Sequence, residues 1–389
     1  MRVLHIGKFY PPHPGGIERT CADLAGALAG RGVATAVLAH SEPGTHRGRS
    51  FRSGEVDVTL VACHRQFLYV PLSPGFPWQL ERAIRRFRPD LLHLHVPNTS
   101  AFAALLLRSA RRLPWIVHWH ADVAADAQHA ALRLAYRFYR PWEQALLARA
   151  RAVIATSTPY LHASAALAAW RDKVRVIPLG IAAAGRVPDV AVPAVWQDGT
   201  LRVLAVGRLS YYKGFDVLLD ALAHVPRAGL VLVGEGEGMA RLRARARECG
   251  IESRVTFAGH VDDATLTALY ANADVLCLPS IDRSEAFGLV LLEAMRAGVP
   301  AIASDIRGSG VGYVVRAGET GLLVPPGDAE ALATALRGMA HDDVARRRMG
   351  EAGARRWRDE FTLERAAERT LTLYHDVLGA ERSTAARTA

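Results

Sequence analysis

Two carboxylates, Glu285 and Glu293, lie eight residues apart in the segment SEAFGLVLLEAMRAGVPAIAS. The spacing predicts a helix that begins near Phe287 or Gly288. Glu285 then lies on the loop before the helix, and Glu293 lies in its second turn. The backbone N–H groups of Phe287, Gly288 and Leu289 would be unpaired at the positive end of the helix dipole, an arrangement that binds phosphate. Carboxylates beside a phosphate site suit a nucleotide-sugar, which has sugar hydroxyls on both sides of a diphosphate.

The two carboxylates are expected to bind different sugars. Glu285 would contact hydroxyls of the sugar on one side of the diphosphate, and Glu293 would accept hydrogen bonds from both ribose hydroxyls on the other, because one carboxylate can take two donors. Glu293 could instead be a charge on the helix surface. Its neighbours are apolar in the sequence LVLLEAM, however, so we expect this carboxylate to be partly buried and to have partners.

Four further segments accompany the carboxylate pair: FYPPHPGGIER, HWHAD, VGRLSYYKGFDVLLDAL and VVRAGETGLLVPPGD. In this order and spacing they resemble the E-x7-E motif and its companions in the retaining glycosyltransferases of family 4. The match runs from about residue 3 to about residue 375. The resemblance implies the GT-B architecture, in which two doubly wound Rossmann-like α/β domains face each other across a cleft, and a reaction that retains the anomeric configuration.

Length and residue pattern support two domains. The chain has 389 residues, and short apolar runs alternate with segments of helical period, as expected for buried parallel strands in repeated βα units. We expect an acceptor-binding domain over 1–180, a linker poor in periodicity over 181–199, and a nucleotide-sugar domain over 200–360. A last helix over about 362–378 would, as in the family, pack back on the first domain.

Composition points to a globular cytoplasmic protein. Half of the residues are hydrophobic, yet no apolar run reaches the length of a membrane span. The amino-terminal residues lead directly into a strand-like run, so we expect no signal peptide. The four cysteines form no CxxC pair and are expected to stay reduced.

Positive charge is concentrated in the first half. Residues 1–185 contain 23 Lys and Arg against 11 Asp and Glu. Such a surface could meet an anionic membrane, a diphosphate-linked acceptor or nucleic acid, although a coding bias toward arginine would produce the same count.

The loop PPHPGG follows the first predicted strand. Gly15 and Gly16 would let the backbone approach a phosphate or sugar closely, although an ordinary turn also explains them. The spacing is not G-x-G-x-x-G, so a nicotinamide site is not supported. The family resemblance implies that these glycines lie near the donor phosphate and the entry of the acceptor.

His120 lies just past the predicted strand 115–119, at the carboxyl end where open α/β sheets bind ligands. His118 could equally be a structural histidine on this strand. The resemblance implies that His120 hydrogen-bonds the donor sugar and stabilises developing charge. Asp122 would orient His120 or touch the acceptor.

Arg208 and Lys213 follow the first strand of the second half in GRLSYYKG. They could be solvated surface charges, but an arginine fork and a lysine can also neutralise a diphosphate leaving group. The family match favours this second role. The sequence contains no Asp-x-Asp pair and no recognisable His/Cys ligand cluster, so we predict metal-independent chemistry without a cofactor.

Residues near the nucleotide base are less specific. Gly234, in VGEGE, resembles the family turn beside the base, although a plain βα turn would have the same residues. Val261 follows the next strand and would frame the base through backbone groups. Which base is bound does not follow from these residues.

Segment 129–151 mixes arginines with aromatic residues: Arg133, Arg137, Arg140, Tyr136, Phe138, Tyr139 and Trp142. This mixture fits a half-buried helix with a solvated basic face, a membrane interface or single-stranded nucleic acid. With the resemblance in view we expect peripheral contact with the membrane and no nucleic acid.

Bacterial enzymes of polysaccharide and O-antigen assembly look similar in the segments GRLSYYKGFDVLLDAL and SIDRSEAFGLVLLEAM. The resemblance therefore suggests mannose from GDP-mannose as donor and a lipid-linked or oligosaccharide acceptor. UDP-linked hexoses are the alternative, and a non-catalytic nucleotide-sugar binder is a rival. A phosphorylase would need a pyridoxal lysine, and Lys213 is the one lysine of the second half. Acceptor, linkage and oligomeric state stay open.

Overall fold

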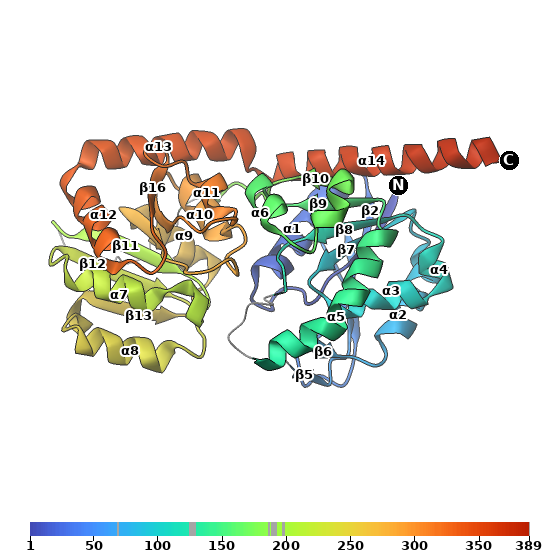
Figure 1. The fold of residues 1–389 in the computed structure, drawn as a ribbon, viewed down its shortest axis with the longest axis horizontal. Coiled ribbons are helices and arrows are strands. Elements are labelled where there is room, and N and C mark those ends of the chain that lie inside the picture. Colours follow the sequence, from blue (N-terminus) through green and yellow to red (C-terminus); the bar gives the residue numbers. More distant parts are fainter. Residues whose placement is uncertain (68–69, 124–129, 186, 188–192, 197–198, 389) are drawn as a thin grey trace. The chain divides into compact units, whose positions relative to one another are not determined.

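The computed structural model describes residues 1–67, 70–123, 130–185, 187, 193–196 and 199–388. The chain forms two compact units (Figure 1). The first consists of Met1–Gly180 and Leu363–Ala389, and the second of Ile181–Thr362. Segment 181–199 groups with the second unit. Both units alternate strands and helices around a sheet that is mostly or wholly parallel, which confirms the predicted α/β class.

The first unit contains an eight-stranded sheet in the order β10-β9-β8-β7-β1-β2-β4-β3. All neighbouring pairs are parallel except β3 with β4. Its central strands are buried because apolar residues occupy both alternations, whereas the edge strand β3 is exposed and polar. The strands are β1 (Arg2–Ile6), β2 (Ala34–His40), β3 (Arg49–Ser53), β4 (Val56–Val61), β7 (Leu91–Val96), β8 (Trp115–Trp119), β9 (Ala152–Ala155) and β10 (Val174–Val176), beside a separate hairpin of β5 (Arg65–Phe67) and β6 (Val70–Leu72).

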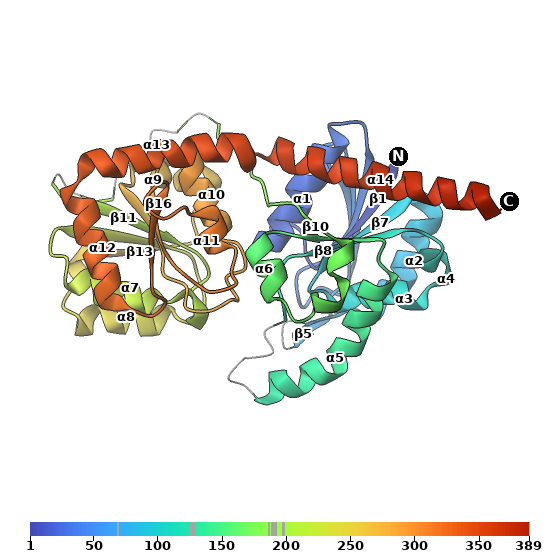
Figure 2. The same cartoon turned by 45° about the horizontal axis from the view of Figure 1, so that its top comes forward.

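Helices α1 and α14 pack together on one face of this sheet (Figures 1 and 2). Leu28 of α1 and Tyr374 of α14 share a core with Val3 and Leu91. The last helix runs to Thr388, beyond its predicted end near 378. The helices of the unit are α1 (Gly16–Ala29), α2 (Phe76–Phe87), α3 (Ala103–Leu106), α4 (Arg108–Arg111), α5 (Ala130–Arg149), α6 (Thr158–Ala163) and α14 (Leu363–Thr388), with short helices η1 (Thr99–Phe102) and η2 (Ala168–Lys173).

The face under α1 and α14 changes from apolar to imidazole along the strands. Residues two apart on a strand share a face. Val3, Leu91 and Ile116 are in the apolar core of this face. Two residues further along the same strands are His5, His93 and His118, all buried. The sheet therefore presents a row of imidazoles toward the carboxyl ends of β1, β7 and β8.

The second unit contains six parallel strands in the order β13-β12-β11-β14-β15-β16. Leucine- and valine-rich strands and the helices over them form one apolar core. The strands are β11 (Leu201–Val206), β12 (Ala228–Val233), β13 (Val255–Gly259), β14 (Val275–Leu278), β15 (Ala301–Ser304) and β16 (Gly321–Val324). The helices are α7 (Phe215–Ala223), α8 (Met239–Glu248), α9 (Asp263–Asn272), α10 (Leu289–Arg296), α11 (Val311–Val314), α12 (Ala329–His341) and α13 (Asp343–Glu360), with η3 (Tyr211–Lys213) and η4 (Glu252–Arg254).

The strand order reverses at one point in each sheet. In the first it lies between β1 and β7, and in the second between β11 and β14. Open α/β sheets bind ligands at the carboxyl ends of the strands at such points. Within the described part of the chain, no helix combines the length and the apolarity that a membrane crossing requires.

Candidate active site

Lys213 and Glu285 form a buried ion pair at the reversal point of the second sheet. Lys213 ends η3 after β11, and Glu285 lies on the loop after β14. The distance from Lys213 Nζ to Glu285 Oε2 is 2.6 Å. Ser280 donates a hydrogen bond to the same oxygen at 2.9 Å. Burial alone would lower the pKa of Lys213, but the carboxylate beside it outweighs this effect, so the pKa lies above its ordinary value.

Gly214 explains how these residues, 72 positions apart, come together. It adopts a left-handed conformation with φ of 63° between η3 and α7. A Cβ atom there would lie 2.1 Å from the carbonyl oxygen of Pro279. Only glycine permits this approach, which brings the backbone after Lys213 against the loop that carries Ser280. Predicted to contact diphosphate and sugar separately, Lys213 and Glu285 contact each other in this structure.

The start of α10 forms the predicted helix mouth. The helix begins at Leu289, and its N-cap, Gly288, has a φ of 84° and provides no side-chain cap. Apart from bonds inside the helix, no backbone bond to a described residue uses the N–H groups of Phe287, Gly288 or Leu289. Ser309 donates a hydrogen bond to the carbonyl of Glu285 and so holds the preceding loop. Free N–H groups therefore follow Glu285 closely in the sequence, an arrangement that favours anion binding.

Glu293 lies in the second turn of α10 and is half-buried. Its Oε2 atom accepts a hydrogen bond of 2.8 Å from the hydroxyl of Tyr270, on α9. Sequence reasoning predicted that Glu293 has partners but did not find Tyr270. No local pattern relates the two, because they lie on different helices.

Arg208 is exposed at the end of β11. Its side chain forms no ion pair with a residue in the described ranges, whereas its positive charge opposes the raised pKa of nearby Lys213. A desolvated ammonium next to an exposed guanidinium creates a positive region at the carboxyl edge of the sheet. A multiply charged anion would be attracted to it.

Packing within the second unit requires a glycine at position 234. Its φ is 133°, and a Cβ atom would lie 2.0 Å from the carbonyl oxygen of Gly207. The glycine is therefore required for packing between the ends of β11 and β12. Val261 lies two residues after the end of β13 and is half-buried. A role of either residue beside a nucleotide base stays a prediction.

The first unit contains the remaining predicted residues. Gly15 precedes α1, which begins at Gly16. A Cβ atom on Gly15 would lie 2.0 Å from Oε2 of Glu18, so the carboxylate of this residue, three positions further on, lies against the glycine. A phosphate approaching the mouth of α1 would have to displace this carboxylate, because both are anions.

Asp122 ties the end of β8 to α6 and the turn after it. Its Oδ1 atom accepts hydrogen bonds from Trp119 Nε1 at 2.9 Å and from Ser164 Oγ at 2.6 Å. Its backbone N–H donates to the hydroxyl of Tyr160 at 2.6 Å. These contacts give Asp122 a structural role, and its predicted action on His120 or on the acceptor stays a prediction.

His120 is buried directly after β8 and belongs to a cluster that sequence reasoning missed. His5, His93 and His95 have ligand nitrogens within 4.8 Å of one another, and so do His95, His118 and His120. The expectation that the chain has no histidine ligand cluster is therefore wrong, because the fold brings these histidine nitrogens close together. The repeats H-x-H in LLHLHV and IVHWH were the available signal, because parallel pairing of β7 with β8 places both repeats on one face.

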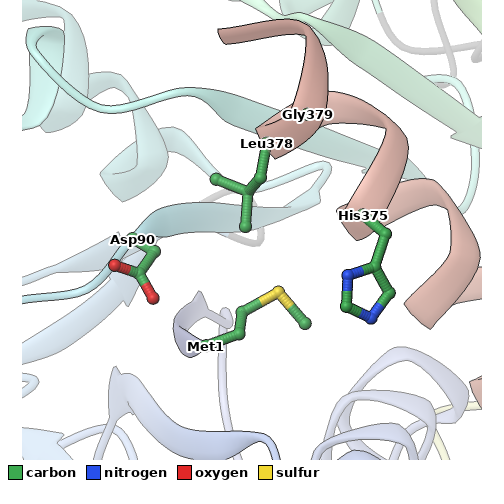
Figure 3. Close-up of a pocket in the computed structure, with 5 residues that line it drawn as sticks. All are labelled: Met1, Asp90, His375, Leu378 and Gly379. Carbon is green, nitrogen blue, oxygen red and sulfur yellow. The ribbon is translucent and has the colours of Figure 1, made fainter. Parts of the chain in front are cut away.

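A pocket of about 320 Å³ lies at the opposite end of the first sheet. Met1 and Asp90, which precede β1 and β7, line it together with His375, Leu378 and Gly379 of α14 (Figure 3). None of the predicted site residues is among them. The amino-terminal edge of a parallel sheet is not where this class of fold binds its ligands.

Known proteins resemble this chain over nearly its whole length. Residues 192–356 match the glycosyl transferases group 1, and residues 15–180 match the glycosyl transferase 4-like domain. The O-antigen chain mannosyltransferase C of Escherichia coli is 31% identical, over 97% of this chain and 99% of that protein. The D-rhamnosyltransferase WbpZ of Pseudomonas aeruginosa is 33% identical, over 93% of this chain and 92% of that protein.

Among solved structures, the sucrose-phosphate synthase from Thermosynechococcus elongatus superposes with a TM-score of 0.81 at 25% identity. The match covers 98% of this chain and 100% of that one. The resemblance inferred from the five sequence motifs is thus confirmed at the level of the family and of the GT-B fold.

Proposed function

Since this chain belongs to the group 1 glycosyltransferases, we propose that it transfers a hexose from a nucleotide-sugar to a lipid-linked or oligosaccharide acceptor with retention of anomeric configuration. The donor binds mainly to the second unit, and the acceptor to the first. The product belongs to a cell-surface polysaccharide such as an O-antigen. UDP-hexose is the alternative donor to GDP-mannose.

The contact between Lys213 and Glu285 at the mouth of α10 carries this proposal. A diphosphate would find the ammonium of Lys213, the guanidinium of Arg208 and the N–H groups at Gly288 together. Glu285 keeps Lys213 charged despite its burial and offers its second oxygen to a sugar hydroxyl. These groups stabilise the negative charge that develops on the leaving diphosphate.

The reaction exchanges one C–O bond for another. The bond between the anomeric carbon and the diphosphate oxygen breaks as the acceptor oxygen bonds to the same carbon from the same face, and the hydroxyl proton passes to the departing diphosphate. His120 hydrogen-bonds the sugar during this step. No residue is assigned as a covalent nucleophile, so a glycosyl-enzyme adduct trapped and detected by mass spectrometry would contradict the mechanism.

The sugar is proposed to have the manno configuration. One relative is named for mannose and another for D-rhamnose, which is 6-deoxy-D-mannose. The two sugars have the same arrangement of ring hydroxyls and differ only at C6, so sites for them need to differ only in the contact with C6. This agreement supports GDP-mannose as donor.

The first experiment is a thermal shift assay with GDP, UDP, ADP and their common sugar conjugates, with and without EDTA. A ligand that binds the native state alone raises the melting temperature. We expect stabilisation by GDP and GDP-mannose that EDTA does not change and that Arg208→Gln weakens. Stabilisation by UDP conjugates alone would replace the donor, a requirement for a divalent cation would contradict metal-independent chemistry, and no response to any nucleotide would contradict the transferase proposal.

Peripheral membrane contact is proposed through α5. Leu134, Phe138 and Trp142 follow one another at intervals of four residues and are exposed, Phe138 to 72%. Arg133 and Arg137 are exposed on the same helix. An exposed apolar stripe flanked by arginines suits the headgroup region of an anionic membrane, where a lipid-linked acceptor resides.

Cosedimentation with vesicles of anionic lipid tests this contact. Replacement of Arg133, Arg137 and Arg140 by glutamine should reduce vesicle binding while hydrolysis of the donor continues. The matched control removes three exposed arginines of α13, Arg347, Arg348 and Arg355, and should leave binding unchanged. Equal loss in both triple variants would show a nonspecific effect of net charge and would contradict the proposed face.

A further inference from the structure

Three buried histidines form a hydrogen-bonded chain that ends at His120. His5 Nδ1 lies 3.1 Å from His95 Nε2, and His95 Nδ1 lies 2.9 Å from His120 Nε2. The three rings come from β1, β7 and the residue after β8, and each is at most 5% exposed. Neither of the two outer partners is near His95 in sequence, so parallel strand pairing alone creates the chain.

Each ring of the chain is neutral. Burial lowers the pKa of His5 to about 3 and lowers those of His95 and His120 well below their usual value, and the neighbouring imidazoles lower the pKa of each ring further. A neutral imidazole carries one proton, so one of its nitrogens donates and the other accepts. Two arrangements then satisfy both bonds. Either the Nδ1 atoms of all three rings carry the protons, or the Nε2 atoms do.

The far end of the chain distinguishes the two arrangements. His5 Nε2 is fully buried and has no hydrogen-bond partner among the described residues. If the protons were on the Nε2 atoms, His5 would bury an N–H group without an acceptor. If they are on the Nδ1 atoms, His5 buries only an unused lone pair. Buried donors without acceptors are rarer in proteins than acceptors with unused lone pairs, because an unpaired N–H is costly in an apolar interior.

We propose that His95 is a positioning residue that holds His120 in the tautomer protonated at Nδ1, through the chain His5–His95–His120. His95 donates from Nδ1 to His120 Nε2, and His5 donates from Nδ1 to His95 Nε2. The printed hydrogen bond of the His120 ring to a described residue uses Nε2, so Nδ1 is left for a ligand. His120 therefore presents an N–H donor, not an acceptor, to a ligand at the carboxyl edge of the sheet.

The inference rests on the proposed function in one respect, namely that His120 faces the sugar of a bound donor. An N–H donor at this position matches a hydroxyl or ring oxygen that becomes more negative during transfer. A histidine locked in the other tautomer would offer a lone pair and would repel that oxygen. The remote chain thus decides what chemistry the nearest ring can perform, as second partners of a catalytic histidine generally do.

A second histidine pair lies beside the chain without joining it. His93 Nδ1 bonds the hydroxyl of Tyr374, and His93 Nε2 lies 3.3 Å from His118 Nδ1. His118 borders a small cavity together with Thr20 and Thr370. His118 Nε2 is also fully buried and has no hydrogen-bond partner among the described residues, so the same argument places the proton of His118 on Nδ1, which donates to His93 Nε2. The pair is not hydrogen-bonded to the chain, although the ring of His118 stacks on that of His120 with centroids 4.1 Å apart.

A transition metal is the competing explanation for such a cluster. A tetrahedral ion with nitrogen ligands at about 2.0–2.1 Å would hold the ligand nitrogens about 3.3 Å apart. The two distances within the chain, 3.1 and 2.9 Å, are instead those of hydrogen bonds. Three neutral, fully buried ligands would also leave a dication uncompensated in the protein interior.

Nitrogen-15 NMR of the imidazoles in the full-length protein tests the tautomer directly, because protonated and bare ring nitrogens have well-separated shifts. The His120 signals are identified by their loss in His120→Asn. We expect a protonated Nδ1 and a bare Nε2. A protonated Nε2 would overturn the proposal, whatever the donor sugar is, so this result is independent of the proposed function.

Substitution of His95 tests the consequence for turnover. His95→Leu should lower kcat about 10- to 100-fold with a smaller change in the donor KM, in line with losses seen for second partners of functional histidines. His95→Asn should recover most of kcat, because its amide can donate from the place of Nδ1. The matched control, Tyr374→Phe, removes a hydrogen bond from the neighbouring pair and should change kcat less than threefold.

Equal losses in His95→Leu, His95→Asn and Tyr374→Phe would show a merely structural role and would overturn the proposal. The same protein preparations are analysed for metal by inductively coupled plasma mass spectrometry. One equivalent of a transition metal that disappears in His95→Leu would also overturn it. If His120→Asn itself retained full activity while the tautomer was as proposed, the proposed function of His120 would fail and the chain would stand.

Discussion

The two units solve the same problem, a polar group buried at the reversal point of a sheet, in different ways. The second unit keeps charge and compensates it, with Lys213 and Glu285 only 2.6 Å apart. The first unit removes charge, because His5, His95 and His120 each carry one ring proton, are joined by hydrogen bonds and stay neutral. Compensation requires a partner of opposite charge, whereas neutralisation requires a pKa that burial can move past neutral pH.

This difference assigns a different task to each unit. A retained ammonium, aided by Arg208, can meet a diphosphate, whose charge increases on departure. A neutral imidazole can donate a directed hydrogen bond to a sugar without attracting the diphosphate away from its own site. The two units should also differ in their response to pH, since the pKa of Lys213 is raised and those of the buried histidines are lowered.

The largest effect should be an acid-induced loss of stability confined to the first unit. Its described part contains six buried histidines: His5, His40, His93, His95, His118 and His120. Their pKa values lie below those of the unfolded chain, so their stabilisation is present above about pH 6.5 and is lost as the pH falls. For His5 alone, a pKa lowered from 6.5 to about 3 corresponds to about 4–5 kcal/mol of folding stability, which is lost as the pH falls from 6.5 to 3. Hydrogen exchange measured by mass spectrometry at pH 5 and 7.5 should show opening of the first unit only.

Two variants make this prediction specific. His118→Leu should reduce the pH slope of unfolding by about one proton, because it removes one buried titrating ring. His375→Gln, at an exposed position on α14, should leave the slope unchanged. If both units opened together at pH 5, the contrast between neutralised and compensated groups would not hold.

Lys213→Met should have the next largest effect. Loss of the ammonium should lower kcat about 100- to 1000-fold, as for other preorganised electrostatic groups. It also leaves Glu285 buried without a counterion, which should lower the free energy of unfolding by about 3–5 kcal/mol. Steady-state kinetics and urea unfolding measure the two consequences separately.

The double variant Lys213→Met/Glu285→Gln separates stability from catalysis. With both charges removed, most of the lost stability should return, because replacing a whole buried pair is nearly neutral. Activity should stay low, since no cation then faces the diphosphate. A double variant as unstable as Lys213→Met would mean that the pair is not the compensated unit described above.

The sequence was sufficient to predict features that depend on one segment, but not contacts between distant segments. The helix mouth at Gly288 and the positions of Glu285 and Glu293 could be predicted because they depend on the spacing within one segment. The contact of Lys213 with Glu285 could not, because it depends on a left-handed Gly214 and on two loops that are distant in sequence. Both sheets were predictable as parallel from their buried strands, whereas the short edge strand β3 and the terminal strand β16 carried too weak a pattern.

The histidine chain shows this limit most clearly. Alternate histidines in β7 and β8 were visible in the sequence, but one residue of register decides whether two such repeats meet. The observed pairing of His95 with His118 across β7 and β8 places His120 one step further along the same face. His5 joins through β1, whose register with β7 aligns it with His93. Register is a property of the folded sheet, so the histidine chain was not predictable.

Glu143 of α5 extends the rule of the first unit to a carboxyl group. It is buried, accepts a hydrogen bond of 3.0 Å from Tyr136, and has no partner at Oε1 among the described residues. Burial raises its pKa to about 7. A pKa raised on folding means that stability is full below the unfolded value of about 4.3 and is lost as the pH rises toward 7. Glu143→Gln should therefore stabilise the protein at pH 8 by about 3–4 kcal/mol and leave it unchanged at pH 4.5, as measured by urea unfolding.

An equal gain at both pH values would show that Glu143→Gln acts through packing and not through charge. Glutamine has nearly the same volume as glutamate and can still accept the hydrogen bond from Tyr136, so the comparison isolates the effect of the charge. The carboxyl group opposes the acid lability of the histidines between about pH 4.3 and 7. Glu143 and His118 have different hydrogen-bond partners, so the double variant Glu143→Gln/His118→Leu should have the sum of the two separate pH slopes.

The smallest effect compares two uncharged hydrogen-bond partners of site residues, Tyr270 beside Glu293 in the second unit and His95 beside His120 in the first. Tyr270→Phe removes the 2.8 Å hydrogen bond to Glu293 and leaves the ring in place. Glu293 can still accept hydrogen bonds from a ribose, but it is less well oriented, at a cost of about 1 kcal/mol. The donor KM should therefore rise about fivefold with little change in kcat, since a ribose contact is made equally in the ground and transition states. His95→Leu should show the reverse pattern, a fall in kcat with little change in KM. A kcat effect in Tyr270→Phe as large as that of His95→Leu would remove the distinction between a unit that binds the donor and a unit that acts on its sugar during transfer.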